Sequence, residues 1–319
     1  MLESTLHLPN RDTPILVFGK DGQVGLALQV FCKEGSWSYV TFLGRDDCDL
    51  SDREALMTVL DRYQPQIIVN ASGYTAVDQA ETEPDLAFAV NRDAVALMAE
   101  YIACVPQGVL VHYSTDYVYS GQQQTPYLES DHPEPLSVYG QSKLAGDNAI
   151  IQAFRDLESG AKYFILRTSW VYGQGGNFIR TMLRLAKEKE HLRVVADQYG
   201  VPTSADWLAS LAMEFMKSNS PSGIYHAVPD GQTSWHQLAL FVIELARMMG
   251  QDMKVAAENV LAISSSEYPV AAPRPKNSCL SNDRLKLVLS DRTITQQFPT
   301  WQEQVTSYVK QYVGHALKS

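Results

Sequence analysis

The segment Ile15-Leu-Val-Phe-Gly19-Lys-Asp-Gly22-Gln-Val-Gly25 decides how this chain folds. Its four leading apolar residues predict a buried strand, and a helical apolar pattern continues after the last glycine through Leu26, Leu28 and Val30. Glycines between a parallel strand and a helix let the backbone approach a ligand closely, and the free amides and dipole of the helix favour a pyrophosphate. The segment therefore predicts a dinucleotide site, with a glycine-rich turn that holds no ligand as the alternative.

Strand-length apolar segments recur along the first half of the chain and alternate with longer helical patterns, such as the one through Leu86, Val90, Leu97 and Tyr101. This alternation is typical of an α/β fold with a doubly wound parallel sheet that is covered on both faces. We therefore predict a dinucleotide-binding Rossmann domain over residues 14–170. Its strands are expected at Ile15–Phe18, Tyr39–Leu43, Ile67–Val69, Val109–Tyr113 and Tyr163–Leu166.

The pattern loosens beyond residue 170, where helical segments at 178–188 and 235–249 alternate with loops rich in proline and glycine. We interpret residues 171–319 as mainly a smaller C-terminal substrate-binding lobe. Short strands at Leu192–Val195 and Ile224–His226 are expected to return to the main sheet. Residues 1–13 have no apolar core of their own and are expected to form an N-terminal extension.

Composition narrows the class of protein. A chain of 319 residues that is 45% hydrophobic can bury a large core. Its formal net charge of −10 argues against nucleic acid or an anionic membrane surface as a partner. The four cysteines lack the CxxC spacing of zinc sites and are expected to be small buried thiols, which suits a reducing cytoplasm. The sequence contains no run of about 18 apolar residues, so it predicts no membrane-spanning helix.

Tyr139 and Lys143 are four residues apart in the segment Tyr139-Gly-Gln-Ser-Lys143. On a helix this spacing places both side chains on one face, and an ammonium beside a phenol is expected to lower the pKa of the phenol toward the working pH. Such a phenol is a suitable acid for the reduction of a ketone. The same pair also arises by chance on solvated helix faces, so the motif gains its weight from the glycine turn upstream.

Together, several segments resemble one family, the dTDP-4-dehydrorhamnose reductases, which belong to the extended short-chain dehydrogenases. The resemblance runs from about residue 14 to about residue 301, with the motifs in order. It rests on the glycine turn and on Val69-Asn-Ala-Ser-Gly-Tyr-Thr-Ala-Val-Asp-Gln-Ala-Glu81, His112-Tyr-Ser-Thr-Asp-Tyr-Val118, Val138-Tyr-Gly-Gln-Ser-Lys-Leu-Ala-Gly146, Arg167-Thr-Ser-Trp-Val-Tyr172, Asp197-Gln-Tyr-Gly-Val-Pro-Thr203 and Arg274-Pro-Lys-Asn-Ser278.

The resemblance implies an NAD(P)H-dependent reduction of the 4-keto group of dTDP-4-dehydro-β-L-rhamnose to dTDP-L-rhamnose. It assigns the proton donor to Tyr139, the partner cation to Lys143, and the third catalytic position to Thr115, which would hydrogen-bond the same sugar oxygen. Without the resemblance, Thr115 and Asp116 are equally well read as a polar turn at the end of a strand.

The resemblance also implies two sets of binding residues. The expected substrate contacts are Thr115, Asp116, Trp170 and Arg274. The guanidinium of Arg274 suits a diphosphate, whereas Trp170 could equally be an aromatic residue of the core. Cofactor contacts fall to Gly19, Gly22, Gln23, Val24, Gly25, Arg45, Asp49, Leu50, Gly73, Tyr74, Thr75, Tyr113, Tyr139 and Lys143.

Two departures bear on cofactors. Arg45 stands about where NAD-specific folds place an acid for the ribose 2′-hydroxyl, which favours NADPH, while the neighbouring Asp46 and Asp47 leave NADH open. Some relatives form a dimer around a magnesium ion held partly by a glutamate two residues after the third glycine. Here that residue is Ala27, which speaks against a bound metal but leaves a homodimer open.

Two other functions compete with the reductase. A nucleotide-sugar dehydratase or epimerase shares the fold and the YxxxK pair, but dehydratases carry Thr-Asp-Glu where this chain has Tyr117 as the third residue. A non-catalytic regulatory subunit of the methionine adenosyltransferase type also resembles this family. The presence of Tyr139, Lys143 and Thr115 favours an enzyme over such a binding module.

Overall fold

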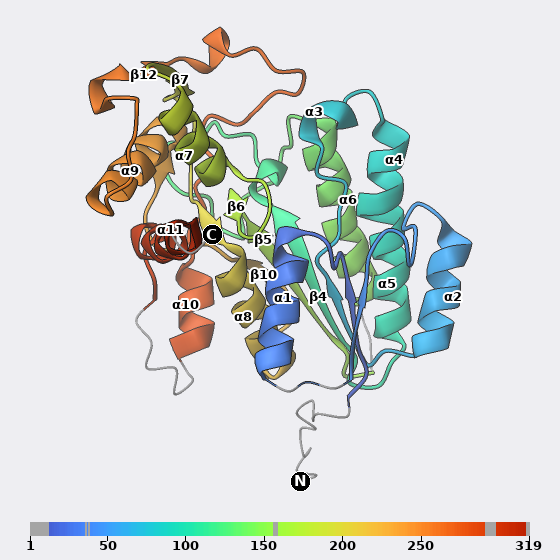
Figure 1. The fold of residues 1–319 in the computed structure, drawn as a ribbon. Helices are drawn as coiled ribbons and strands as arrows, with labels where there is room; N and C mark the ends of the chain where they lie inside the picture. The colour runs from blue at the N-terminus through green and yellow to red at the C-terminus, as the bar shows by residue number, and fades with distance from the viewer. Residues whose placement is uncertain (1–12, 36, 38, 156–158, 291–297, 317–319) are drawn as a thin grey trace.

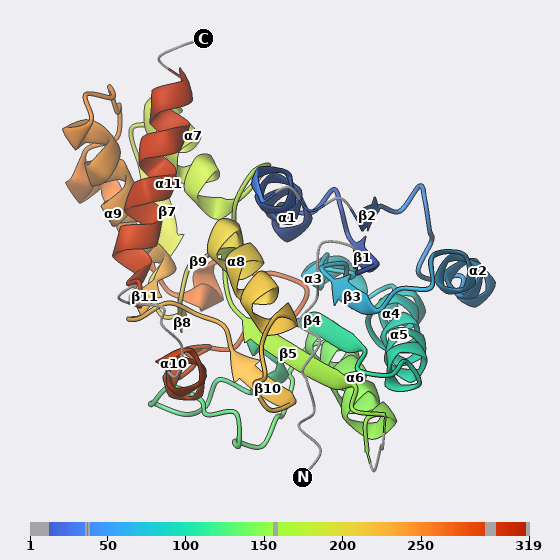
Figure 2. The same ribbon diagram turned by 90° about the horizontal axis from the view of Figure 1, so that it is seen from below.

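A six-stranded parallel sheet forms the centre of the computed structural model, which describes residues 13–35, 37, 39–155, 159–290 and 298–316. The strand order is β10-β5-β4-β3-β1-β2, visible edge-on in Figure 2. The strands are β1 (Ile15–Phe18), β2 (Val40–Leu43), β3 (Ile67–Asn70), β4 (Val109–Thr115), β5 (Lys162–Thr168) and β10 (Gly223–His226).

Helices cover both faces of this sheet (Figure 1). Val17, Val69 and Val111 pack toward α1 (Gln23–Glu34) and α8 (Ala205–Met216), which lie side by side. The alternate strand residues, such as Leu16 and Ile68, pack toward the helices of the other face. Because each strand is buried on both sides, its sequence is apolar throughout instead of alternating. The helices of that second face are α2 (Arg53–Tyr63), α5 (Ala94–Ala103) and α6 (Val138–Ala153).

The winding of the sheet reverses between β1 and β3, since the chain runs from β1 outward to β2 and then crosses back to β3 on the other side of β1. In open parallel sheets the crevice at the carboxyl ends of the strands at such a reversal is the usual ligand site. Gly19 follows β1 at this point, with a φ of 88°, and Ala71 follows β3 beside it. The fold therefore places the glycine turn at the mouth of this crevice.

A second group of elements packs beside the sheet. Its main helices are α7 (Phe178–Glu188), α9 (Trp235–Met248) and α11 (Trp301–Ala316), which share one hydrophobic cluster with β7 (Leu192–Val195) and β12 (Val260–Ile263). The smaller elements are α3 (Val77–Ala80), α4 (Pro84–Phe88), α10 (Asp283–Ser290), the 3₁₀ turns at Asp116–Val118, Ala257–Asn259 and Ser265–Glu267, and the two-residue strands β6 (Val171–Tyr172), β8 (Tyr199–Gly200), β9 (Thr203–Ser204) and β11 (Thr233–Ser234).

Three expectations need correction. The segment Leu192–Val195 forms β7 but pairs with β12, not with the main sheet, whereas 224–226 does pair with β5 as expected. The helix expected through residues 86–101 is interrupted by a π-helical stretch, Ala89–Asp93. Cys104 is exposed, while the other three cysteines are buried. The N-terminal extension predicted for residues 1–13 lies outside the described residues except for Thr13.

None of the helices in the described part of the chain combines the length and apolar content that a bilayer crossing requires.

A buried ion pair connects α6 to the central sheet. Arg167 on β5 donates through Nε to Asp147 Oδ2 at 3.0 Å and through Nη1 to the Tyr119 hydroxyl at 2.8 Å. Both charged side chains are almost fully buried, at 3% and 0% exposure. Each charge therefore depends on the other for compensation.

We expect Arg167→Met to lower the free energy of unfolding by about 3–5 kcal/mol, because it leaves the Asp147 carboxylate buried without its partner. The matched control is Arg193→Met in the exposed pair with Glu267, which should cost no more than about 1 kcal/mol. Urea unfolding followed by circular dichroism measures both. Equal losses in the two variants would contradict the assigned importance of the buried pair.

Candidate active site

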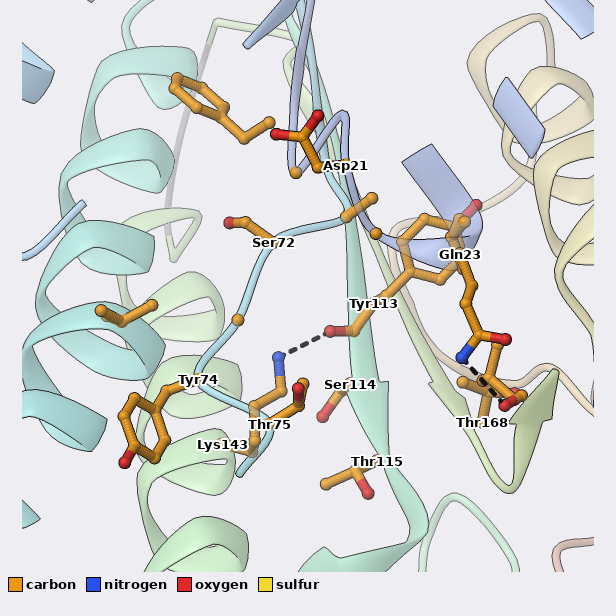
Figure 3. Close-up of a pocket in the computed structure, with 18 of the residues that line it drawn as sticks. Asp21, Gln23, Ser72, Tyr74, Thr75, Tyr113, Ser114, Thr115, Lys143 and Thr168 are labelled. Atoms are coloured by element: carbon orange, nitrogen blue, oxygen red, sulfur yellow. Dashed lines mark hydrogen bonds between the residues drawn. The ribbon is translucent and has the colours of Figure 1, made fainter. Parts of the chain in front are cut away.

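A cavity of about 920 Å³ opens at the carboxyl ends of β1, β3 and β4 (Figure 3). Most residues expected to bind cofactor or substrate line it, although they come from widely separated segments. Gly25 and Arg274 do not line it. The expected residues that do are Gly19, Gly22, Gln23, Val24, Arg45, Asp49, Leu50, Gly73, Tyr74, Thr75, Tyr113, Thr115, Asp116, Tyr139, Lys143 and Trp170.

The three glycines of the turn serve different purposes. A Cβ on Gly19 would lie 2.6 Å from the backbone of Ala71, and a Cβ on Gly25 would lie 2.0 Å from the carbonyl oxygen of Gly19. Both positions therefore exclude a side chain because backbone meets backbone. Gly22 has no neighbour closer than 3.4 Å, and it begins α1 with no side chain capping the helix. The helix start thus presents an open, positively polarised end that fits a pyrophosphate.

The end of β2 carries the charges that bear on cofactor choice. Asp47 accepts a hydrogen bond from Gly44 N at 2.8 Å and pairs with the Lys20 ammonium. The hydrogen bond from Lys20 lowers the pKa of this carboxyl. Asp47 is therefore already occupied by neighbours, whereas Arg45 lines the cavity.

Tyr139 and Lys143 both reach the cavity from α6, and Thr115 reaches it from the end of β4. Desolvation raises the pKa of Tyr139 to about 12, against a hydrogen bond with Thr115 that lowers it. Burial lowers the pKa of Lys143 to about 8, against the charge of Asp147. The expectation that the lysine would lower the phenol pKa was wrong, because burial dominates the pKa of each group and Lys143 has no resolved effect on that of Tyr139.

Lys143 instead points toward β4, as Figure 3 shows. Its Nζ donates to the Tyr113 carbonyl oxygen at 2.7 Å and lies 3.2 Å from His112 Nε2. The shared helix face expected from the spacing is present, but the side-chain nitrogen of Lys143 is held by a backbone carbonyl and an imidazole. The side chain is thereby fixed in a position that faces the cavity.

Asp116 follows Thr115 and is buried at 2% exposure. The Thr115 hydroxyl donates to Asp116 Oδ1 at 3.0 Å. Burial raises the pKa of Asp116 to about 7, while hydrogen bonds from Ser278 and Thr115 lower it. A carboxyl with such a pKa exchanges its proton near neutral pH, so its charge responds to what occupies the cavity.

Of the two residues expected to contact the nucleotide-sugar, Trp170 lines the cavity and Arg274 does not. Trp170 adopts a left-handed backbone, with a φ of 45°, and stacks on Trp235 with ring centroids 3.5 Å apart; both rings line the cavity. Arg274 pairs with Asp78 at 2.8 Å and lies over the Tyr117 ring at 5.8 Å. The guanidinium thus stands beside a residue of the cavity wall but is already bound to a carboxylate.

Sequence reasoning missed Asn91, His112 and Trp235. Asn91 lies in the π-helical stretch, where its Oδ1 accepts from Tyr74 N at 2.9 Å and its Nδ2 donates to Tyr74 O at 3.1 Å. It thereby holds the loop that lines the cofactor side of the cavity. Asn91 stands in the polar run Asn91-Arg-Asp93, so the sequence did not distinguish it from its neighbours. His112, by contrast, gave a signal as a polar residue inside an apolar strand.

Comparison with known proteins identifies the family. The model of the RmlD substrate binding domain matches residues 13–313. A dTDP-4-dehydrorhamnose reductase of Shigella flexneri is 42% identical, over 87% of this chain and 93% of that one. The corresponding protein of Burkholderia thailandensis is 41% identical, over 85% of this chain and 91% of its own length.

Solved structures of dTDP-4-dehydrorhamnose reductases also resemble this chain over most of its length. The dTDP-4-dehydrorhamnose reductase of Bacillus anthracis in complex with NADP has a TM-score of 0.80 and 33% identity, and covers 94% of this chain and 99% of its own. A Clostridium acetobutylicum dTDP-4-dehydrorhamnose reductase has a TM-score of 0.83 and 31% identity, with 94% and 100% coverage. On these matches, which span nearly the whole of both partners, the chain belongs to the dTDP-4-dehydrorhamnose reductase family.

Proposed function

We propose that this protein reduces the 4-keto group of dTDP-4-dehydro-β-L-rhamnose to give dTDP-L-rhamnose, with NADPH as cofactor and NADH as a second choice. The carrying observation is that Tyr139 and Thr115 face one cavity together with the glycine turn of Gly19 and Gly22. An acid, a second hydroxyl and a pyrophosphate-binding turn in one space are what a nicotinamide-dependent ketone reduction requires.

The residues present fit a dinucleotide. The uncapped start of α1 at Gly22 suits the pyrophosphate, and Arg45 suits a 2′-phosphate. NADPH, when bound, supplies the hydride. We assign the ribose hydroxyls to Lys143, and its Nζ, which lies against the Tyr113 carbonyl oxygen at the cavity wall, supports this role.

Tyr139 supplies the proton to the sugar O4, and the Thr115 hydroxyl hydrogen-bonds the same oxygen. A pKa of about 12 keeps the phenol protonated at neutral pH, which is the state that an acid needs. An alkoxide is more basic than a phenolate, so the proton transfer runs downhill despite this high pKa. The raised value therefore suits an acid that acts only when negative charge develops on O4.

Substrate binding falls to the side of the cavity lined by Asp116, Trp170 and Trp235. Trp170 offers a flat apolar surface whose position is fixed by the stack with Trp235. Arg274 is the cation that we assign to the diphosphate, and it would exchange the carboxylate of Asp78 for the phosphate oxygens.

Dehydration or epimerisation is less well supported. At the position where dehydratases carry a glutamate, burial raises the pKa of Tyr117, which stays a protonated phenol at neutral pH. Such a group cannot take up the proton that an elimination releases. The likeness to a UDP-glucose 4-epimerase of Thermus thermophilus, at 19% identity and a TM-score of 0.73, extends to the fold alone.

We expect Tyr139→Phe to reduce turnover by about 10²-fold or more, because it removes the proton donor, while cofactor binding is retained. NADPH oxidation with dTDP-4-dehydro-rhamnose measures turnover, and nicotinamide fluorescence measures binding. Tyr268→Phe, at a residue that is 61% exposed, is the matched control. Near-normal turnover in Tyr139→Phe would rule out its assignment as the acid.

We expect Arg45→Ala to weaken NADPH binding by roughly ten- to a hundredfold and to leave NADH nearly unchanged, since only NADPH carries the 2′-phosphate. Titration of each cofactor by calorimetry measures the two affinities. Arg53→Ala, on the exposed start of α2 and outside the cavity lining, controls for the loss of a positive charge nearby. An equal loss for both cofactors would make Arg45 a structural residue.

We further propose that the protein forms a homodimer without a metal and works in the cytoplasm. Among the described residues no three His, Cys, Asp or Glu side chains gather as metal ligands. Glu303 is, by position, a plausible counterpart of a carboxylate that holds the magnesium ion in some relatives, and it accepts hydrogen bonds from the Thr300 amide and hydroxyl. Ala27 offers no ligand. We expect chelation by EDTA to change neither turnover nor the mass seen by light scattering. A fall in turnover or in the measured mass on chelation, reversed by added magnesium, would overturn the assignment of a dimer without a metal.

A further inference from the structure

His112 is a buried residue that the proposed reaction does not yet use. It lies on β4 at 0% exposure, three residues before Thr115. Its Nε2 is 3.2 Å from Lys143 Nζ, and its Nδ1 is 3.1 Å from Asn70 Nδ2 on the neighbouring strand β3. The imidazole thus links the proposed active-site lysine to the sheet.

The orientation of Asn70 fixes which nitrogen of His112 carries the proton. Asn70 Oδ1 accepts hydrogen bonds from the amide N–H of Ser72, at 3.1 Å, and from the Ser72 hydroxyl. A backbone N–H can only donate, so the oxygen of the carboxamide must face Ser72. The NH₂ group then faces His112, whose Nδ1 accepts the hydrogen bond. A neutral imidazole with a lone pair on Nδ1 carries its proton on Nε2.

The protonated Nε2 of His112 points at the Lys143 nitrogen. An ammonium has no lone pair to accept this hydrogen bond, whereas a neutral amine has one. The amine can still donate to the Tyr113 carbonyl oxygen at 2.7 Å. Burial lowers the pKa of His112 well below its usual value and that of Lys143 to about 8, in keeping with two neutral partners in mildly alkaline solution.

Charging Lys143 disturbs this chain of hydrogen bonds. An ammonium needs a lone pair on His112 Nε2, which moves the imidazole proton to Nδ1, where it meets the NH₂ group of Asn70. Turning the carboxamide relieves that clash but presents NH₂ to the Ser72 amide. Ser72 lines the cavity on its cofactor side. Protonation of Lys143 is thereby coupled to the loop that borders the cofactor site.

We propose that His112, oriented by Asn70, is a positioning residue that selects the neutral form of Lys143 when the cofactor site is empty and couples protonation of Lys143 to the Ser72 loop. The inference rests on the proposed function only in taking Lys143 as the active-site lysine. The charged group that acts on Lys143 is Asp147 on α6, which is itself paired with Arg167 on β5. Tyr113 on β4 offers Lys143 its carbonyl oxygen, and a Cβ on Gly73, after β3, would lie 3.9 Å from the lysine nitrogen. Tyr139 on α6 and Asp116, which begins the 3₁₀ turn after β4, line the same cavity.

The sharpest test is Asn70→Asp, which keeps the shape of the side chain and replaces the donor toward His112 with an acceptor. Both carboxylate oxygens accept, so His112 is held with its proton on Nδ1 and its Nε2 lone pair toward Lys143. The added negative charge acts in the same direction. We expect the pKa of Lys143 to rise by about one unit or more. Carbon-13 NMR of labelled lysine Cε in the cofactor-free protein measures it, with Lys143→Met identifying the resonance.

Two further variants separate the possible causes. Asn219→Asp adds the same charge at an exposed position and should leave the Lys143 titration unchanged. His112→Gln removes the fixed donor without adding charge, since a carboxamide can turn either its oxygen or its NH₂ toward Lys143, and should shift the titration upward. It also serves if Asn70→Asp fails to fold, which thermal melting reports.

A Lys143 titration that stays unchanged in both Asn70→Asp and His112→Gln would overturn the proposal. An upward shift in both, with a matching shift in the pH profile of kcat, supports it. A purely structural role would lower the melting temperature without moving either titration. Because the NMR readout needs no turnover, absence of reductase activity would contradict the proposed function and leave this result standing.

Discussion

The close contact between the turn after β1 and the end of β3 is the constraint on which the rest of the site depends. A Cβ on Gly19 would collide with the backbone of Ala71 after β3, and a Cβ on Gly25 would collide with the carbonyl oxygen of Gly19 within the turn. This contact sets the first turn of α1 at the point where the winding of the sheet reverses, so that the helix start faces the crevice. It also brings the loop after β3 beside Lys143, since a Cβ on Gly73 would lie 3.9 Å from the side-chain nitrogen of that lysine.

The central sheet was largely predictable because burial on both faces leaves a direct trace in sequence. All six of its strands were expected near their observed positions, and the helix at Phe178–Glu188 was predicted with its observed ends. The role of β7 was not predictable. A strand as short as β7, with three apolar residues and Arg193, fits any sheet with a free edge. Its pairing with β12 depends on a strand whose exposed Leu261 and Ala262 give little signal.

The candidate site was predictable as a set of residues, but not in its electrostatics. Spacing placed Tyr139 and Lys143 on one helix face, whereas the pKa of each depends on how much water the folded protein removes from around it. The π-helical stretch that turns Asn91 toward Tyr74 also lacked a local cause. A Cβ on Gly146 of α6 would lie 2.1 Å from the Asn91 carbonyl oxygen, so that widened turn is accommodated by a glycine far away in sequence.

The ion pair between Arg274 and Asp78 changes what an arginine can contribute to affinity. Asp78 also accepts a hydrogen bond from the Ala272 amide at 3.0 Å, so its carboxylate holds the C-terminal loop at two points. If the guanidinium turns to a diphosphate, one charge-assisted contact is exchanged for another, and the net gain is only their difference. The pair would then favour strongly charged ligands. A ligand with a single weak negative charge would gain no binding free energy from replacing Asp78, whereas a doubly charged diphosphate would.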